Sequence, residues 1–138
     1  MVFAGINYAA VLAAAILSFV FAWVWYGALG GLWLAALGSS EIEIRTQGMT
    51  KGPLIITFIA LIVMGWVLAG VLGHLGPDQV TVRNGVISGA FCWLGFVITT
   101  LAANHAFQRR RFALTAIDAS HWLGVLLLQG VVIGIAGV

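Results

Sequence analysis

The sequence predicts an all-α integral membrane protein, built as a four-helix transmembrane bundle. Hydrophobic residues make up 62% of its 138 residues and charged residues only 7%, whereas an ordinary soluble domain is about 25% charged. Four apolar segments each have the roughly 20 residues that a helix needs to cross a bilayer. Lipid cannot satisfy backbone N–H and C=O groups, so segments that span it are expected to be helices. We expect a single transmembrane domain over residues 1–138, with helices at approximately 6–29, 54–75, 81–106 and 112–138.

The first helix is expected to end in an aromatic cluster that includes Trp23, Trp25 and Tyr26. Such rings are typical of the membrane interface. Ser18 lies on a face of small residues, which favours close packing against another helix. The chain opens without a basic stretch or a cleavage site, so we interpret this segment as a retained helix and not as a signal peptide.

Residues 30–53 form the longest stretch outside the expected spans, and we interpret them as an interfacial or cytoplasmic segment. The run Ser40-Glu41-Ile42-Glu43 has the spacing of a capping box, which predicts a short amphipathic surface helix that ends near Gly48. Pro53 is well suited to the first turn of the second transmembrane helix.

The second and third segments differ in their polar content. Residues 54–75 carry few polar side chains, and Gly76-Pro77-Asp78 indicates a turn after them. The third segment has a stripe of small residues that is expected to press against another helix. We expect the packing residues of the whole bundle to be Ser18, Gly85, Gly89, Gly95, Gly130 and Gly134.

The fourth segment carries the polar and ionisable side chains that are best suited to binding or catalysis. At helical spacing Asp118, His121 and Gln129 share one face, while Gly130 and Gly134 lie on the opposite face. Ionisable residues inside a membrane face the protein interior or a water-filled cavity. The candidate intramembrane polar site comprises Asp118, His121, Gln129, Thr99, Thr100 and Asn104.

Three interpretations of this polar site stay open. In the first, Asp118 accepts hydrogen bonds from Thr99 or Thr100, or pairs with Arg111, and so locks the third helix to the fourth, with His121 as a further partner. In the second, the group relays protons or ions. In the third, it binds a polar headgroup or a small solute.

Loop charges predict the orientation of the chain. The first and third loops hold five of the six basic residues, including the run Arg109-Arg110-Arg111, and the second loop holds only Arg83. Because cytoplasmic loops are rich in Lys and Arg, we place the first and third loops in the cytoplasm and both termini outside. The arginine run also suits anionic lipid headgroups, and topology explains it without nucleic acid as a partner.

The sequence offers no motif for a metal, a cofactor or a catalytic nucleophile. Its histidines lack the pairing that metal or haem ligands need, and Cys92 is the single cysteine. Ser120 is the nearest hydroxyl to Asp118 and His121, but it points to another face of the helix. We therefore expect no cofactor, no metal and no enzymatic activity.

Several strings resemble a bacterial family of small four-span membrane proteins, the domain-of-unknown-function family seventeen-sixty-one. They include Trp25-Tyr26, Gly52-Pro53-Leu54, Asn104 and the glycines at 130 and 134, and the similarity is strongest at Trp93-Leu94-Gly95-Phe96-Val97 and at residues 117–123. Asn7–Leu12 and Ser40–Gly48 also match. The resemblance covers nearly the whole chain. It implies four helices in a bacterial inner membrane, and it implies no activity.

Two classes of function follow from these features. In the first, a homo-oligomer provides a binding or permeation site for a small solute or ion, because one small bundle is not expected to bury every small-residue face. In the second, the protein is a non-catalytic accessory or scaffold subunit of a larger membrane complex. The expected partners are therefore the lipid bilayer, further copies of the chain, and an unknown membrane protein.

Overall fold

The computed structural model describes residues 5–38 and 50–137, and these residues form helices and short turns without a strand. Within them, four helical spans are long and apolar enough to cross a membrane. The all-α transmembrane fold is therefore as the sequence predicts. The surface helix expected within residues 40–48 falls outside the described residues. The spans are α1 (Tyr8–Leu37), α3 (Lys51–His74), the continuous rod of α4 (Val82–Cys92), η3 (Trp93–Val97) and α5 (Ile98–Phe107), and α6 (Phe112–Ala136).

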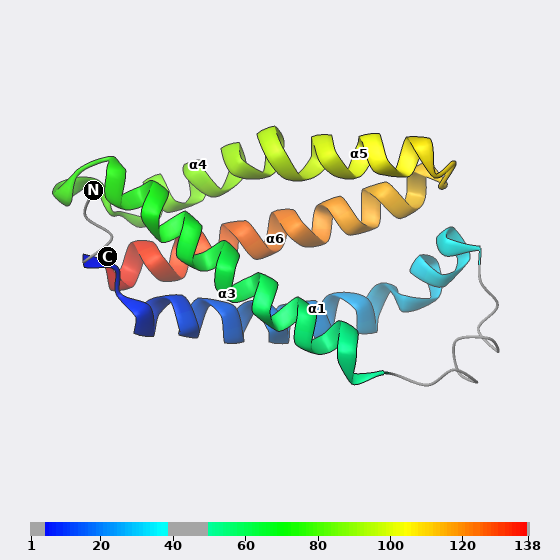
Figure 1. Ribbon diagram of the computed structural model, residues 1–138, viewed down its shortest axis with the longest axis horizontal. Helices are drawn as coiled ribbons and strands as arrows, with labels where there is room; N and C mark the ends of the chain where they lie inside the picture. The colour runs from blue at the N-terminus through cyan, green and yellow to red at the C-terminus, as the bar shows by residue number, and fades with distance from the viewer. Residues whose placement is uncertain (1–4, 39–49, 138) are drawn as a thin grey trace.

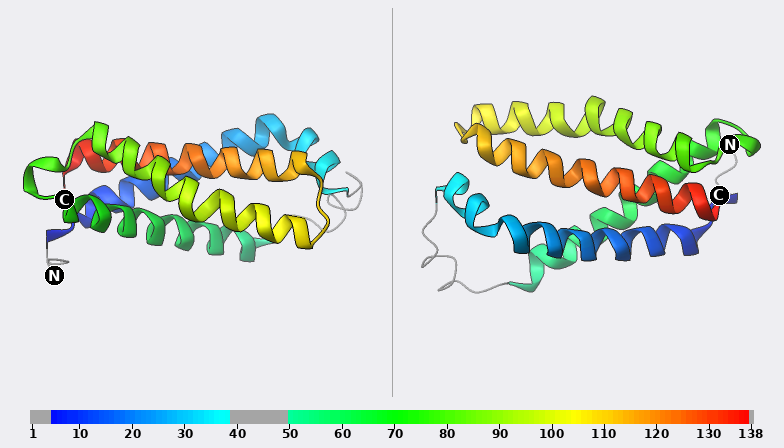
Figure 2. Two further views of the ribbon diagram at one scale, coloured as in Figure 1. Left: turned by 90° about the horizontal axis from the view of Figure 1, so that it is seen from above. Right: turned by 180° about the vertical axis from the view of Figure 1, so that it is seen from behind.

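Helix α6 is the centre of the bundle and contacts α1, α3, α4 and α5. Figures 1 and 2 show α1 along one side of α6 and the α4–α5 rod along the other, while α3 crosses the bundle obliquely. Successive spans run in opposite directions, so the start of α1 and the end of α6 lie at the same end of the molecule (Figure 1). The end of α1 and the turn after α5 lie at the other end.

Helix α1 is longer than expected from the sequence. The expected end at residue 29 is wrong, because the helix runs through Gly30 and Gly31 to Leu37. Gly38 ends it in the left-handed conformation (φ 79°), and its backbone N–H donates to the carbonyl of Leu34. Residues 32–34 therefore belong to the helix and not to an interfacial loop. The extension brings Trp33 alongside α6.

Close backbone packing joins α4 to α6. Gly85 lies against the backbone of Gly130, and a Cβ atom added at Gly89 would stand 2.6 Å from the carbonyl oxygen of Leu126. A Cβ atom added at Gly134 would stand 2.6 Å from the Thr81 carbonyl. Four of the expected packing residues thus pack against neighbouring backbone within a single chain. Small residues permit such contact because backbone dispersion and weak Cα–H···O contacts replace side-chain packing.

The remaining expected packing residues have different surroundings. Ser18 is fully buried in the bundle. Gly95 faces open space, since no atom lies within 4 Å of a Cβ atom built on it. Gly95 belongs to the π-helical turn η3, where the rod changes its winding, so the helical spacing used to place it with Gly85 and Gly89 does not carry through.

The turns at the two ends of the rod are defined by specific residues. Before α4, Gly76 adopts φ 115°, and residues 77–79 form a 3-10 turn. The Thr81 hydroxyl then caps α4 by accepting from the backbone N–H of Asn84 at 3.2 Å. After α5, Arg109 adopts a positive φ of 54° and reverses the chain into α6. The turn after α5 is short, which keeps α4–α5 and α6 antiparallel neighbours.

Candidate functional site

Asp118 lies on the face of α6 that packs against α1. Its Oδ1 accepts two hydrogen bonds from α1, one from the Tyr26 hydroxyl at 2.8 Å and one from the Trp33 indole N–H at 3.1 Å. Asp118 stands six residues into α6, about 9 Å along the helix axis. The two aromatic rings also contact one another, with centroids 5.8 Å apart. The carboxylate is therefore held by neutral donors on a neighbouring helix.

His121 lies one turn further along α6 and is surrounded by aromatic rings. Its side chain is 2% exposed, and its ring stacks on Phe21, with 6.0 Å between centroids and an interplanar angle of 10°. The rings of Tyr26 and Trp122 lie 4.9 Å and 4.8 Å from it. Neither ring nitrogen has a hydrogen-bond partner among the described residues. An imidazole buried in this way costs free energy unless its nitrogens form hydrogen bonds.

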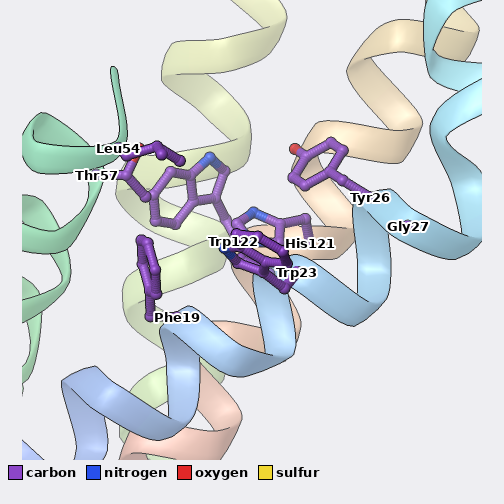
Figure 3. A pocket seen from close by; sticks show the side chains of 9 residues that line it. Phe19, Trp23, Tyr26, Gly27, Leu54, Thr57, His121 and Trp122 are labelled. Atoms are coloured by element: carbon purple, nitrogen blue, oxygen red, sulfur yellow. The ribbon is translucent and has the colours of Figure 1, made fainter. Parts of the chain in front are cut away.

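A cavity of about 480 Å³ opens beside His121. It lies where the first turns of α3 diverge from α1 and α6, and Figure 3 shows aromatic side chains of α1 and α6 gathered around it. Its walls are mostly apolar, and the Thr57 hydroxyl in the wall already donates to the Pro53 carbonyl at 2.8 Å. We call this cavity the aromatic pocket. It is lined by Phe19, Ala22, Trp23, Tyr26, Gly27, Leu54, Thr57, His121 and Trp122.

A second polar position lies deeper in the bundle. The amide N–H of Gln129 donates to the Leu61 carbonyl on α3 at 2.9 Å, and the side chain is fully buried. Its Oε1 atom and the Ser18 hydroxyl have no partner among the described residues. Val125, also fully buried, lies between His121 and Gln129 on α6. Gln129 therefore pins α6 to α3 and does not line the aromatic pocket.

The structure corrects the expected partners of Asp118. Thr99 and Thr100 are exposed, and their hydroxyls donate to carbonyls of their own rod, those of Gly95 and Phe96. Asn104 is also exposed on the outer surface of α5. These three residues do not meet Asp118, because η3 and the close α4–α6 contact turn their face of the rod outward. The expected bond from Asp118 to the third helix is thus wrong, and its carboxylate joins α6 to α1.

Arg111 is not the partner of Asp118 either. Its guanidinium donates to the carbonyl of Ala35 in the last turns of α1, at 3.0 Å. Arg109 and Arg110 are exposed at the same end of the bundle. The contact of Arg111 became possible because α1 extends to Leu37, and a cation near the last carbonyls of a helix also favours the helix dipole.

The sequence reasoning missed the contributions of α1 and Trp122 to this site. Tyr26 and Trp33 are seven residues apart and so share a face of α1, which is the signal that would have paired them. That signal is visible only if residues 30–37 are taken as helical. Among the described residues, no group of three or more His, Cys, Asp or Glu side chains is placed to hold a metal ion.

The fold and the site define a multi-pass membrane protein with an apolar, aromatic-lined pocket inside its helix bundle. A family model matches residues 9–134, and the chain belongs to that family, DUF1761, described as a protein of unknown function. No curated protein and no solved structure matches the chain. Family membership therefore agrees with the resemblance in the sequence and leaves the role of the pocket to be argued from its geometry.

Proposed function

We propose that this protein binds a small, largely apolar solute in the aromatic pocket between α1, α3 and α6. One observation carries the proposal: a cavity between three helices is walled mostly by aromatic rings and contains few polar groups. Ligand sites are commonly cavities of about 300–1,000 Å³, lined by apolar side chains with a few polar groups that fix orientation. A cavity of about 480 Å³ falls in that range.

The chemistry of the wall describes the solute. Phe19, Trp23 and Trp122 offer ring surfaces for an apolar body. His121 adds part of its ring to the same wall, and both of its ring nitrogens are buried. A largely apolar molecule that partitions into a bilayer matches this wall.

The polar residues favour binding over ion conduction. Along α6, the fully buried, apolar Val125 lies between the polar side chains of Asp118 and Gln129. This layer also contains Ala15 and Leu61, both fully buried. A polar route along the bundle axis would have to pass through it. We therefore place the solute in a pocket that ends at this layer, and we do not propose a pore within one bundle.

We also propose a bacterial inner membrane location, with the loops after α1 and α5 in the cytoplasm and both termini outside. Supporting this, Lys51 and Arg109–Arg111 lie at one end of the bundle and Arg83 near the other. Self-association stays a prediction. The glycine faces of α4 and α6 no longer support it, because they are occupied by each other within one chain.

Native mass spectrometry of the protein extracted from its own membrane tests solute binding. We expect the wild type to carry a bound small molecule in addition to phospholipid. Trp122→Ala, which removes a wall of the pocket, is expected to lose that molecule. Phe107→Ala is the matched control, since Phe107 is 92% exposed at the end of α5 and lies outside the pocket lining. A wild type without any adduct, or equal retention by both variants, would contradict the proposal.

An accessory or scaffold role is the second candidate, favoured by the outer face of the α4–α5 rod. Phe91 and Phe96 are 73% and 74% exposed there, and only 6% of the most apolar stretch of the rod is buried. A lipid-facing helix presents the same surface, so we rank this role below solute binding. Co-purification of a stoichiometric membrane protein that is lost on Phe96→Ala would favour it.

A further inference from the structure

We propose that the solute of the aromatic pocket is a lipophilic organic cation, such as an ammonium group attached to an apolar body. This inference rests on the proposed binding function and names its ligand class. The pocket supplies aromatic rings for the positive group, and Asp118 supplies the negative charge.

Asp118 is held by neutral groups only among the described residues. Its two donors, the Tyr26 hydroxyl and the Trp33 indole, are neutral. No basic nitrogen of the described residues lies within 4.0 Å of its carboxylate, and Arg111 is engaged at the Ala35 carbonyl. Ionisable groups at this depth are expensive and are normally paired. A cationic ligand would provide the counter-charge that the described part of the chain does not.

Tyr26 connects the charge of Asp118 to the pocket. The Tyr26 ring is part of the pocket wall, while its hydroxyl donates to Asp118 at 2.8 Å. A phenol that donates to a carboxylate gains electron density on its ring, and a cation is attracted to an electron-rich ring face. Asp118 thus acts on the pocket through Tyr26, as a positioning residue that is not itself part of the lining.

Two tryptophan rings and several apolar side chains form the remaining walls of the aromatic pocket. Trp gives the strongest cation–π contacts of the aromatic residues, and the pocket has two, Trp23 on α1 and Trp122 on α6. Leu54 and Phe19 offer apolar surface for the rest of the molecule. The Thr57 hydroxyl already donates to a carbonyl of its own helix, α3. This part of the wall therefore does not require a ligand that forms a hydrogen bond. Several rings around a space with few polar groups suit a quaternary ammonium better than a strongly hydrated primary amine.

Paired probes test the charge preference directly. The experiment measures dissociation constants by calorimetry for the full-length protein in phosphatidylcholine nanodiscs, with empty nanodiscs subtracted. The cationic probe is benzyltrimethylammonium, and the neutral probe is neopentylbenzene, which replaces the charged nitrogen with carbon at the same shape. For the wild type we expect the cation to bind at least about tenfold more tightly than the neutral probe, and a tenfold ratio is about 1.4 kcal/mol.

Asp118→Asn separates charge from hydrogen bonding, because an Asn side-chain oxygen still accepts from Tyr26 and Trp33. We expect this variant to lose about tenfold in affinity for the cationic probe and to keep its affinity for the neutral one. Tyr26→Phe keeps the ring in the wall but removes the hydroxyl that donates to Asp118. This variant should lose part of the preference for the cationic probe over the neutral one. Phe107→Ala is the control, because Phe107 is 92% exposed at the end of α5 and lies outside the pocket lining, and it should leave the preference intact.

The outcomes distinguish this inference from the proposed function. If both probes bind the wild type equally, or if Asp118→Asn weakens both alike, the cation preference is overturned while a binding pocket remains. If neither probe binds, the proposed function fails as well. Thermal unfolding of each variant shows whether it folds, and Tyr26→Phe keeps the inference falsifiable should Asp118→Asn be unstable.

Discussion

The hydroxyl of Tyr26 donates a 2.8 Å hydrogen bond to Oδ1 of Asp118 across 92 residues of sequence. This bond, together with the one from Trp33, joins the last turns of α1 to the first turns of α6. The same tyrosine ring contacts His121 and forms part of the aromatic pocket. One side chain therefore belongs both to the connection between two helices and to the candidate binding site.

The Tyr26–Asp118 connection predicts a specific order of stabilities. Asp118→Ala leaves the donors of Tyr26 and Trp33 without an acceptor, whereas Asp118→Asn supplies one. We expect Asp118→Ala to be less stable than Asp118→Asn by about 1–2 kcal/mol, since single hydrogen bonds contribute about 0.5–1.5 kcal/mol. Denaturant unfolding in mixed micelles measures the difference. Asp78→Ala, at an exposed turn, is the control for loss of a carboxylate. Equal stability of the two Asp118 variants would show that the bonds do not hold α1 to α6.

Periodicity predicted which side chains of α6 share a face, but not which helix that face meets. Asp118, His121 and Gln129 do lie together on one side, and Gly130 and Gly134 lie toward α4. Helical spacing is a property of one helix, so it was available from the sequence. The partner of Asp118 depends on how four helices pack, and the spacing within one helix does not give that.

The length of α1 was the other feature that local signals misjudged. The expected helix ends at residue 29, directly before Gly30 and Gly31, and glycine weakens helices in water. Near lipid, leaving the helix would expose backbone groups that nothing else satisfies, so the helix continues to the glycine that can adopt positive φ. The aromatic pocket could not have been predicted either, since its lining comes from three different helices, α1, α3 and α6.

The α4–α6 contact predicts unequal effects of two glycine substitutions in the same rod. At Gly89 an added Cβ would lie 2.6 Å from the Leu126 carbonyl oxygen, so Gly89→Ala must push the helices apart. Overpacking of this kind costs about 1–3 kcal/mol. Gly95→Ala meets no atom within 4 Å and should change the free energy of unfolding little. Thermal unfolding of both variants in the same detergent compares them. A destabilised Gly95→Ala would indicate that a second molecule covers that face.

Gln129 provides a test of whether the bundle centre is dry. Gln129→Leu keeps the size of the side chain but removes the bond to the Leu61 carbonyl, together with the Oε1 atom that has no partner among the described residues. In a dry core the cost of losing the hydrogen bond is nearly offset by the gain from removing the unpartnered Oε1 atom. Hydrogen bonds between membrane helices average about 0.6 kcal/mol. We therefore expect a change in the free energy of unfolding below about 1 kcal/mol. A loss above about 2 kcal/mol would mean that water or a ligand satisfies Oε1, as a polar route through the Val125 layer would require.

Single cysteines at the two ends of the α4–α5 rod test the proposed orientation. Gln79 and Gln108 are both exposed, in the turn before α4 and directly after α5. With Cys92→Ala as background, we expect a membrane-impermeant maleimide to label Gln79→Cys on intact spheroplasts and Gln108→Cys only after permeabilisation. The reason is that the basic residues Arg109–Arg111 follow Gln108 and favour the cytoplasm. The reverse pattern would invert the orientation without changing the bundle. Labelling of both sites on intact spheroplasts would mean that copies insert in both directions, so the loop charges alone do not fix the orientation.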